Sequence, residues 1–148
     1  MSGRHALLLM AITVAGGERA QGQGVHRELG VQGLVLVGDA TAIGVGGYWG
    51  VRPTARARIS LMAGGGSLTG RGFARGELLT HFLLAPAKRQ GAALYVAGGL
   101  ALDAASRTDA RIVALVGIEG RPGARRGWIV EGGVGGGWRF AAGWRWRR

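Results

Sequence analysis

The sequence predicts an all-β fold: an eight-stranded antiparallel up-and-down β-barrel. Beyond about residue 25, the chain divides into segments of about 10–13 residues that are separated by turn-like joints. Within the segments, apolar residues alternate with small or polar residues. Because successive side chains of a strand point to opposite faces, this alternation is typical of strands with two different faces. A chain of 148 residues is long enough for one such domain with one modest core.

The first six expected strands run roughly over residues 26–38, 41–51, 56–65, 73–85, 91–103 and 110–120, with a looser Gly/Ser/Thr stretch at 64–72. In chain order, the apolar face of these strands is formed by Leu29, Val31, Val35 and Val37; Ile43, Val45, Trp49 and Val51; Ile59, Leu61 and Ala63; Leu78, Phe82 and Leu84; Leu94, Val96, Leu100 and Leu102; and Ile112, Ala114, Val116 and Ile118. Pro53, Pro86 and Pro122 fall in the second, fourth and sixth joints. Proline is kept out of strand ladders, so this placement favours antiparallel hairpins.

The last two expected strands lie on either side of a joint near residues 135–137. In the final strand, one parity is aromatic and the other holds small residues and arginines. The aromatic positions are Trp138, Phe140, Trp144 and Trp146. In a soluble barrel the apolar face would point inward, whereas in a membrane barrel it contacts lipid and the polar face lines the interior. The strand length matches the roughly 9–11 residues that a tilted strand needs to cross a bilayer, so we expect a transmembrane barrel.

The opposite parity, which would face the interior, is rich in Gly and Ala and carries charges of both signs. We predict an interior polar network of Glu28, Arg58, Arg75, Glu77, His81, Arg111, Glu119, Glu131, Arg139 and Arg145. An unpaired buried charge is costly, so the carboxylates are expected to pair with arginines. A barrel of eight strands is just wide enough to be filled by side chains, so a channel is not expected.

Aromatic residues are expected to form a girdle where the barrel wall meets the membrane interface. The tryptophans assigned to this girdle are Trp49, Trp128, Trp138, Trp144 and Trp146. Tyr48 and Tyr95 are further candidates for it. The alternative is that these aromatic residues pack in the core of a soluble barrel.

Residues 1–23 are interpreted as a signal peptide, which leaves residues 24–148 as the barrel domain. Arg4 and His5 form a basic start, residues 6–15 are apolar, and small residues suited to cleavage follow near residues 20–24. The alternative is a buried N-terminal helix. No later segment offers about 18 uninterrupted apolar residues, so helical membrane spans are not expected.

Composition argues against several functions. The formal net charge is +11, but its arginines are spread along the chain and not gathered in one run, so nucleic-acid binding is not expected. The chain has no Cys and only 3 His, which leaves no thiol chemistry and argues against a metal site. The glycine-rich runs at 44–47 and 132–137 lack the Lys-Ser/Thr ending of a phosphate loop. We therefore expect no cofactor and no metal.

A hydrolytic site is the catalytic arrangement that we weigh against a purely structural interior. Ser60, His81 and Glu77 are the types that a Ser-His-acid hydrolase uses. The His-x-Ser pattern of barrel lipid-A deacylases is missing, because Phe82 and Leu83 follow the histidine. The favoured interpretation is an interior histidine bonded to a carboxylate, and the chain is not expected to be an enzyme.

With its export signal, alternating segments, strand number and aromatic final strand, the chain resembles the small eight-stranded outer-membrane β-barrel proteins of Gram-negative-type bacteria, the OmpA- and OmpX-like group. The resemblance covers about residues 25–148. It implies a bacterial outer-membrane location, contact with outer-membrane lipid and the outer-membrane assembly machinery, and a structural or unassigned membrane role without catalysis. We expect a monomer. Two alternatives remain: a soluble periplasmic or secreted barrel that binds a small apolar ligand, and a barrel lipid hydrolase with His81 as its base.

Overall fold

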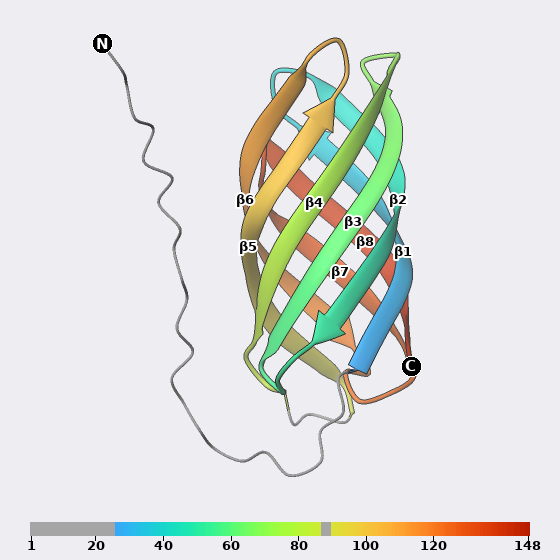
Figure 1. The fold of residues 1–148 in the computed structure, drawn as a ribbon, viewed down its shortest axis with the longest axis vertical. Helices are drawn as coiled ribbons and strands as arrows, with labels where there is room; N and C mark the ends of the chain where they lie inside the picture. Colours follow the sequence, from blue (N-terminus) through green and yellow to red (C-terminus); the bar gives the residue numbers. More distant parts are fainter. Residues whose placement is uncertain (1–25, 87–89) are drawn as a thin grey trace, which may run out of the picture.

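Eight strands form a closed antiparallel barrel in the computed structural model, which describes residues 26–86 and 90–148 (Figure 1). The strands are β1 (His26–Val37), β2 (Thr41–Arg52), β3 (Ala57–Leu68), β4 (Arg71–Leu83), β5 (Ala92–Ala104), β6 (Thr108–Gly120), β7 (Arg126–Val134) and β8 (Trp138–Arg147). Each strand pairs with its neighbours in the chain, and β8 pairs with β1 to close the barrel. The predicted fold class is confirmed. The signal peptide expected at 1–23 lies outside the described residues.

One expectation about the strand boundaries is wrong. The stretch 64–72 is not a loose connection, because β3 continues to Leu68 and β4 begins at Arg71. The turn between them is Thr69-Gly70, and both residues have positive φ values of 49° and 81°, as a tight two-residue hairpin turn requires. A Cβ atom at Gly66 would run into the backbone carbonyl of Ile43, so the glycines here let neighbouring strands approach closely.

The barrel has two ends of different construction. At one end the turns 38–40, 69–70, 105–107 and 135–137 connect the strands in pairs, and we call this the turn end. At the other end lie the joints 53–56 and 121–125 and the residues 84–86 and 90–91, together with the first residue of β1 and the last residue of β8 (Figure 1). We call this the terminal end. It also holds all three prolines, as the sequence predicts.

The two faces of the barrel wall differ sharply. The outward side chains are large and apolar along the strands, from Leu29 on β1 to Trp146 on β8, and are exposed. The inward side chains are buried and include both apolar and charged residues. The apolar ones form two clusters, one on β4, β5 and β6 around Tyr95, and one near the turn end around Leu34 and Phe73. Among the described residues there is no helix with the length and hydropathy needed to span a membrane.

Candidate functional site

The barrel interior is the candidate site, because most of the buried charged side chains gather there in two connected groups. The lower cluster lies toward the terminal end and consists of Glu28, Arg52, Arg58, Glu119, Arg145 and Arg147. The upper cluster lies toward the turn end and consists of Arg75, Glu77, Asp103, Glu131 and Arg139. Strand alternation places all of these residues on the inward parity of their strands.

Glu119 on β6 is the centre of the lower cluster. Its Oε2 atom accepts from Arg58 Nη1 at 2.8 Å and from Arg145 Nη2, while its Oε1 atom accepts from Arg52 Nη2 at 3.0 Å. Arg147 Nη2 lies 3.4 Å from the same carboxylate. These four arginines come from β2, β3 and β8, so one carboxylate ties together strands from separate parts of the ring.

Glu28 on β1 is the second carboxylate of the lower cluster. It accepts from Arg52 Nε at 2.7 Å, from Arg147 Nε at 2.9 Å and from Arg145 Nη1 at 3.0 Å. The hydroxyl of Tyr48 donates to it across 3.5 Å. Because arginines are shared between the two carboxylates, the lower cluster is one network and not a set of separate pairs.

Positive charge is in excess in the lower cluster, since four guanidinium groups face two carboxylates. Tyrosine rings accommodate part of this excess. The guanidinium of Arg58 lies 4.7 Å from the ring centre of Tyr95, and that of Arg145 lies 5.8 Å from the ring centre of Tyr48. A cation over an aromatic face is attracted to it, and more strongly where water is excluded.

Arg139 on β8 is the centre of the upper cluster. Its Nη2 and Nε atoms donate to both oxygens of Glu77 at 2.7 and 3.0 Å, and its Nη1 atom donates to Glu131 at 2.9 Å. Arg75 donates to Glu77 at 2.7 Å and to Asp103 at 2.6 Å. A bidentate guanidinium–carboxylate pair has fixed geometry as well as strength. Glu77 lies on β4 and Arg139 on β8, four strands apart in the ring of eight, so this pair crosses the lumen.

His81 and Ser60 contact each other deep in the interior, but their hydrogen bonds oppose hydrolysis. Arg58 Nη2 lies 2.9 Å from His81 Nδ1, and Ser60 Oγ lies 2.7 Å from His81 Nε2. A guanidinium can only donate, so Nδ1 must accept and the proton of the neutral ring must be on Nε2. His81 therefore donates to the serine hydroxyl and has no free nitrogen to accept its proton. A hydrolase needs the reverse arrangement.

Most residues of the predicted polar network are buried and bonded to one another, and Arg111 is the exception. Its side chain is 48% exposed at the turn end and lies 3.5 Å from Asp109, outside both clusters. It lies near the start of β6, where the inward-facing side chains are also accessible to solvent. The expectation that His81 bonds to a carboxylate is also wrong, since its partners are Arg58 and Ser60.

The network also contains members that the sequence analysis left out. Arg52 and Arg147 were overlooked because each is the last residue of its strand, beside a turn or the chain end. Tyr48 and Tyr95 are buried inside and do not belong to a girdle. Their parity carried this signal, because both alternate with the outward apolar residues of their strands.

The five tryptophans assigned to the girdle all point outward, with exposed fractions between 39% and 63%. Trp49, Trp128, Trp144 and Trp146 lie toward the terminal end, and Trp138 lies at the opposite end of β8. The aromatic band is therefore concentrated at the terminal end.

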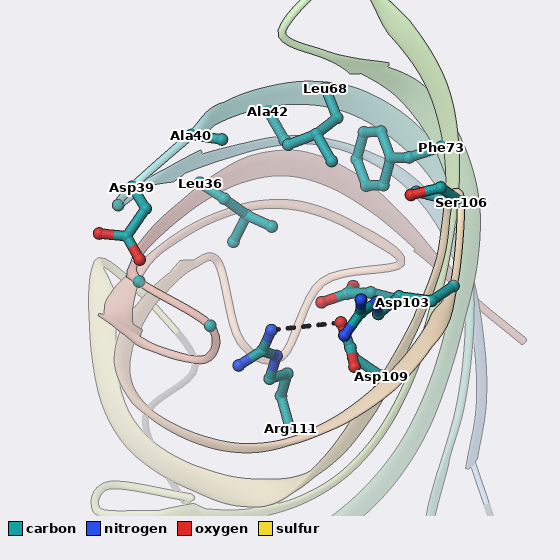
Figure 2. A pocket seen from close by; sticks show the side chains of 15 residues that line it. Leu36, Asp39, Ala40, Ala42, Leu68, Phe73, Asp103, Ser106, Asp109 and Arg111 are labelled. Atoms are coloured by element: carbon teal, nitrogen blue, oxygen red, sulfur yellow. Dashed lines mark hydrogen bonds and ion pairs between the residues drawn. The ribbon is translucent and has the colours of Figure 1, made fainter.

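An open pocket of about 660 Å³ lies at the turn end, above the upper cluster. Figure 2 shows Leu36, Leu68 and Phe73 along one wall, with Asp103 and Arg111 on the facing side. Arg75 lies beneath the pocket. Its guanidinium donates to Asp103, which lines the pocket, and to the carbonyl of Gly135, so these hydrogen bonds hold it in place there.

No protein-family model matches the chain, and no curated protein matches its sequence. Several solved structures match its fold, and two of them are described here. The N-terminal β-barrel domain of Pseudomonas aeruginosa OprF has a TM-score of 0.64 at 16% identity, over 83% of this chain and 97% of that chain. Neisserial surface protein A (NspA) has a TM-score of 0.62 at 10% identity, over 84% of this chain and 97% of that chain. At these identities the likeness concerns the fold, and the chain has the fold of the small eight-stranded outer-membrane barrels.

Proposed function

We propose that the chain is a bacterial outer-membrane β-barrel with a structural role, whose interior is closed by its own side chains and which is neither a pore nor an enzyme. The observation that carries this proposal is the reversal of the usual burial. Arg58, Arg139 and Glu119 are fully buried inside, while large apolar side chains are exposed around the outside. In water such a surface would be unstable, whereas in a bilayer it is the expected lipid-facing band.

A closed lumen follows from the two clusters. The pair between Glu77 and Arg139 joins opposite walls of the barrel, and both side chains are buried. Below it, the arginines bonded to Glu119 bridge β2, β3, β6 and β8. An ion would have to break these charge-assisted bonds to pass, which makes conduction unfavourable.

The two other functions considered for the sequence have less support. A soluble barrel that binds an apolar ligand needs an apolar cavity, but this interior is crossed by paired charges. A lipid hydrolase needs His81 as a base, but its Nδ1 atom already accepts from Arg58 and its Nε2 atom donates to Ser60. Ser60 is also buried, so a lipid ester cannot reach it.

Membrane fractionation with a heat-modifiability gel tests the location and the fold. We expect the protein in the outer-membrane fraction, and a different mobility for unboiled and boiled samples. Recovery in the soluble fraction would refute the proposal.

Planar bilayer recording tests the closed lumen. We expect no conductance steps from the purified barrel, and ion leakage from the double variant Glu77→Ala/Arg139→Ala, which removes the pair that crosses the lumen. The matched control is Asp109→Asn/Arg111→Gln, which removes an exposed pair at the mouth and should leave the barrel silent. Steady conductance of the unmodified protein would show that the lumen is open.

A further inference from the structure

We propose that the outer wall of the barrel carries a binding site for an anionic glycerophospholipid at the terminal end, where β8, β1 and β2 meet. The phosphate would lie between Arg27 and Arg148, and one acyl chain would run along Leu29 between Trp49 and Trp146. This inference rests on the proposed function, since it needs the outer wall to face lipid. It adds a specific lipid partner on the outer wall of the barrel.

The apolar part of the site is set by strand register. Leu29 on β1 pairs with Trp49 on β2 and with Trp146 on β8, so the three side chains lie side by side on the outer face. Leucine is shorter than tryptophan, so the row has a low centre and two high walls. These residues, with Arg27 and Arg148, line an open groove of about 580 Å³. Its floor is one side chain wide, which suits a single acyl chain.

The charged part of the site lies one outward position closer to the terminal end. The backbone of Arg27 donates to the carbonyl of Arg148 at 3.2 Å, and Arg148 N donates to the carbonyl of Arg27 at 3.0 Å. The two residues are therefore a hydrogen-bonded cross-strand pair, with their Cα atoms about 5.5 Å apart. Both share the outward parity of Leu29 and Trp146, and both side chains are exposed.

Two like charges directly opposite each other across strands destabilise a sheet. No acidic side chain within residues 26–86 and 90–148 forms an ion pair with either Arg27 or Arg148. The neighbouring arginines Arg52 and Arg147 are bonded to the carboxylates of the lower cluster. An anion between the two outward guanidinium groups would remove this repulsion, and a phosphate accepts from two arginines at once.

The position of the groove favours a glycerophospholipid over a free anion. The tryptophans around it belong to the aromatic band of the terminal end, where a bilayer has its phosphate groups. The two charges lie on the side of the groove away from the middle of the barrel, so a lipid could place its phosphate on them and its acyl chain over Leu29. A headgroup with net negative charge fits a pair of guanidinium groups better than a zwitterionic one, whose ammonium they would repel.

Native mass spectrometry of the folded barrel in detergent tests the site, with phosphatidylglycerol and phosphatidylethanolamine of identical acyl chains as probes. A basic residue near an anionic lipid surface contributes about five-fold in binding. We therefore expect the unmodified barrel to bind phosphatidylglycerol at least about ten-fold more tightly than phosphatidylethanolamine. The variant Arg27→Gln/Arg148→Gln should lose most of this preference. The matched control Arg71→Gln/Arg107→Gln removes two exposed charges at the turn end and should keep it.

Two further arms separate a lipid from a bare phosphate. Leu29→Trp fills the low centre of the groove with both arginines in place, and we expect it to weaken phosphatidylglycerol binding. Soluble glycerophosphoglycerol, the headgroup alone, should not displace the lipid at equal concentration. If the headgroup competes equally and Leu29→Trp binds normally, the site holds phosphate and the lipid proposal is wrong.

Failure of this inference is distinguishable from failure of the proposed function. Each variant is first checked for heat-modifiability. If Arg27→Gln/Arg148→Gln does not fold, the variant Arg27→Lys/Arg148→Lys, which keeps both charges, is tested in its place. A barrel that folds in membranes but shows no preference, or loses it equally in the turn-end control, overturns the lipid site alone. A chain that stays soluble overturns the membrane function itself.

Discussion

Removal of the Glu119 carboxylate should strongly destabilise the barrel. In the variant Glu119→Gln the shape of the side chain is kept, but four arginines then face the single carboxylate of Glu28. Breaking a buried ion pair by removing one partner costs about 3–5 kcal/mol, because the other charge stays buried and unpaired. Glu119 serves several arginines in a cluster that already has excess positive charge, so we expect a loss near the upper end, about 5 kcal/mol.

The free energy of unfolding in lipid vesicles, measured from tryptophan fluorescence in urea, gives this loss directly. The control Asp109→Asn breaks an exposed pair at 3.5 Å and should cost less than about 1 kcal/mol. The double variant Arg58→Met/Glu119→Leu removes one charge of each sign and should be more stable than Glu119→Gln alone. A loss for Glu119→Gln no greater than for the control would refute the reasoning, since the interior would then have to be wet.

Three other substitutions test separate features of the wall. Leu100→Arg places a charge on the outward face near the middle of β5, and should reduce the free energy of unfolding in vesicles by about 2–4 kcal/mol; no change would mean that this face does not contact hydrocarbon. Gly117→Val would overlap the ring of Tyr95 and should cost about 1–3 kcal/mol in the same assay, whereas Gly47→Val points into open space and should be neutral. Tyr95→Phe leaves Glu131 without the hydroxyl that donates to it at 2.7 Å, and we expect a loss of about 1–3 kcal/mol by urea titration; equal stability would mean that water replaces the hydroxyl.

The fold could be predicted from the sequence because its signal is local and repeated. Alternation over eight segments fixes which residues share a face, and proline in every second joint fixes the order of hairpins. The boundary that was missed, at 64–72, lies where glycine removes the alternation. Gly64 and Gly66 carry no side chain to mark a face, and β3 is held there by its pairing with β2 and β4 instead.

The interior residues could be chosen by parity, but their partners could not. Glu77 and Arg139 are 62 residues apart in the sequence and meet because closure brings β8 opposite β4. Nothing in the local pattern distinguishes this pairing from others of opposite charge. The same limit explains the error on the partners of His81. Arg58 and Ser60 could both be assigned to the interior from the sequence. Their contact with His81 depends on the register of β3 against β4, which the local pattern does not give.

The register itself is specified by both faces of the wall together. A slip of one residue in β4 would turn Arg75, Glu77 and His81 toward lipid and bring apolar side chains into the charged interior. A lipid-facing arginine near the membrane middle costs about 2–4 kcal/mol, and the guanidinium of Arg139 would lose its bidentate partner as well. An apolar interior would penalise the same slip much less, because apolar residues are tolerated on either face. We infer that the charged interior, although each buried ion pair adds little net stability, excludes the neighbouring registers and so selects the single closed barrel.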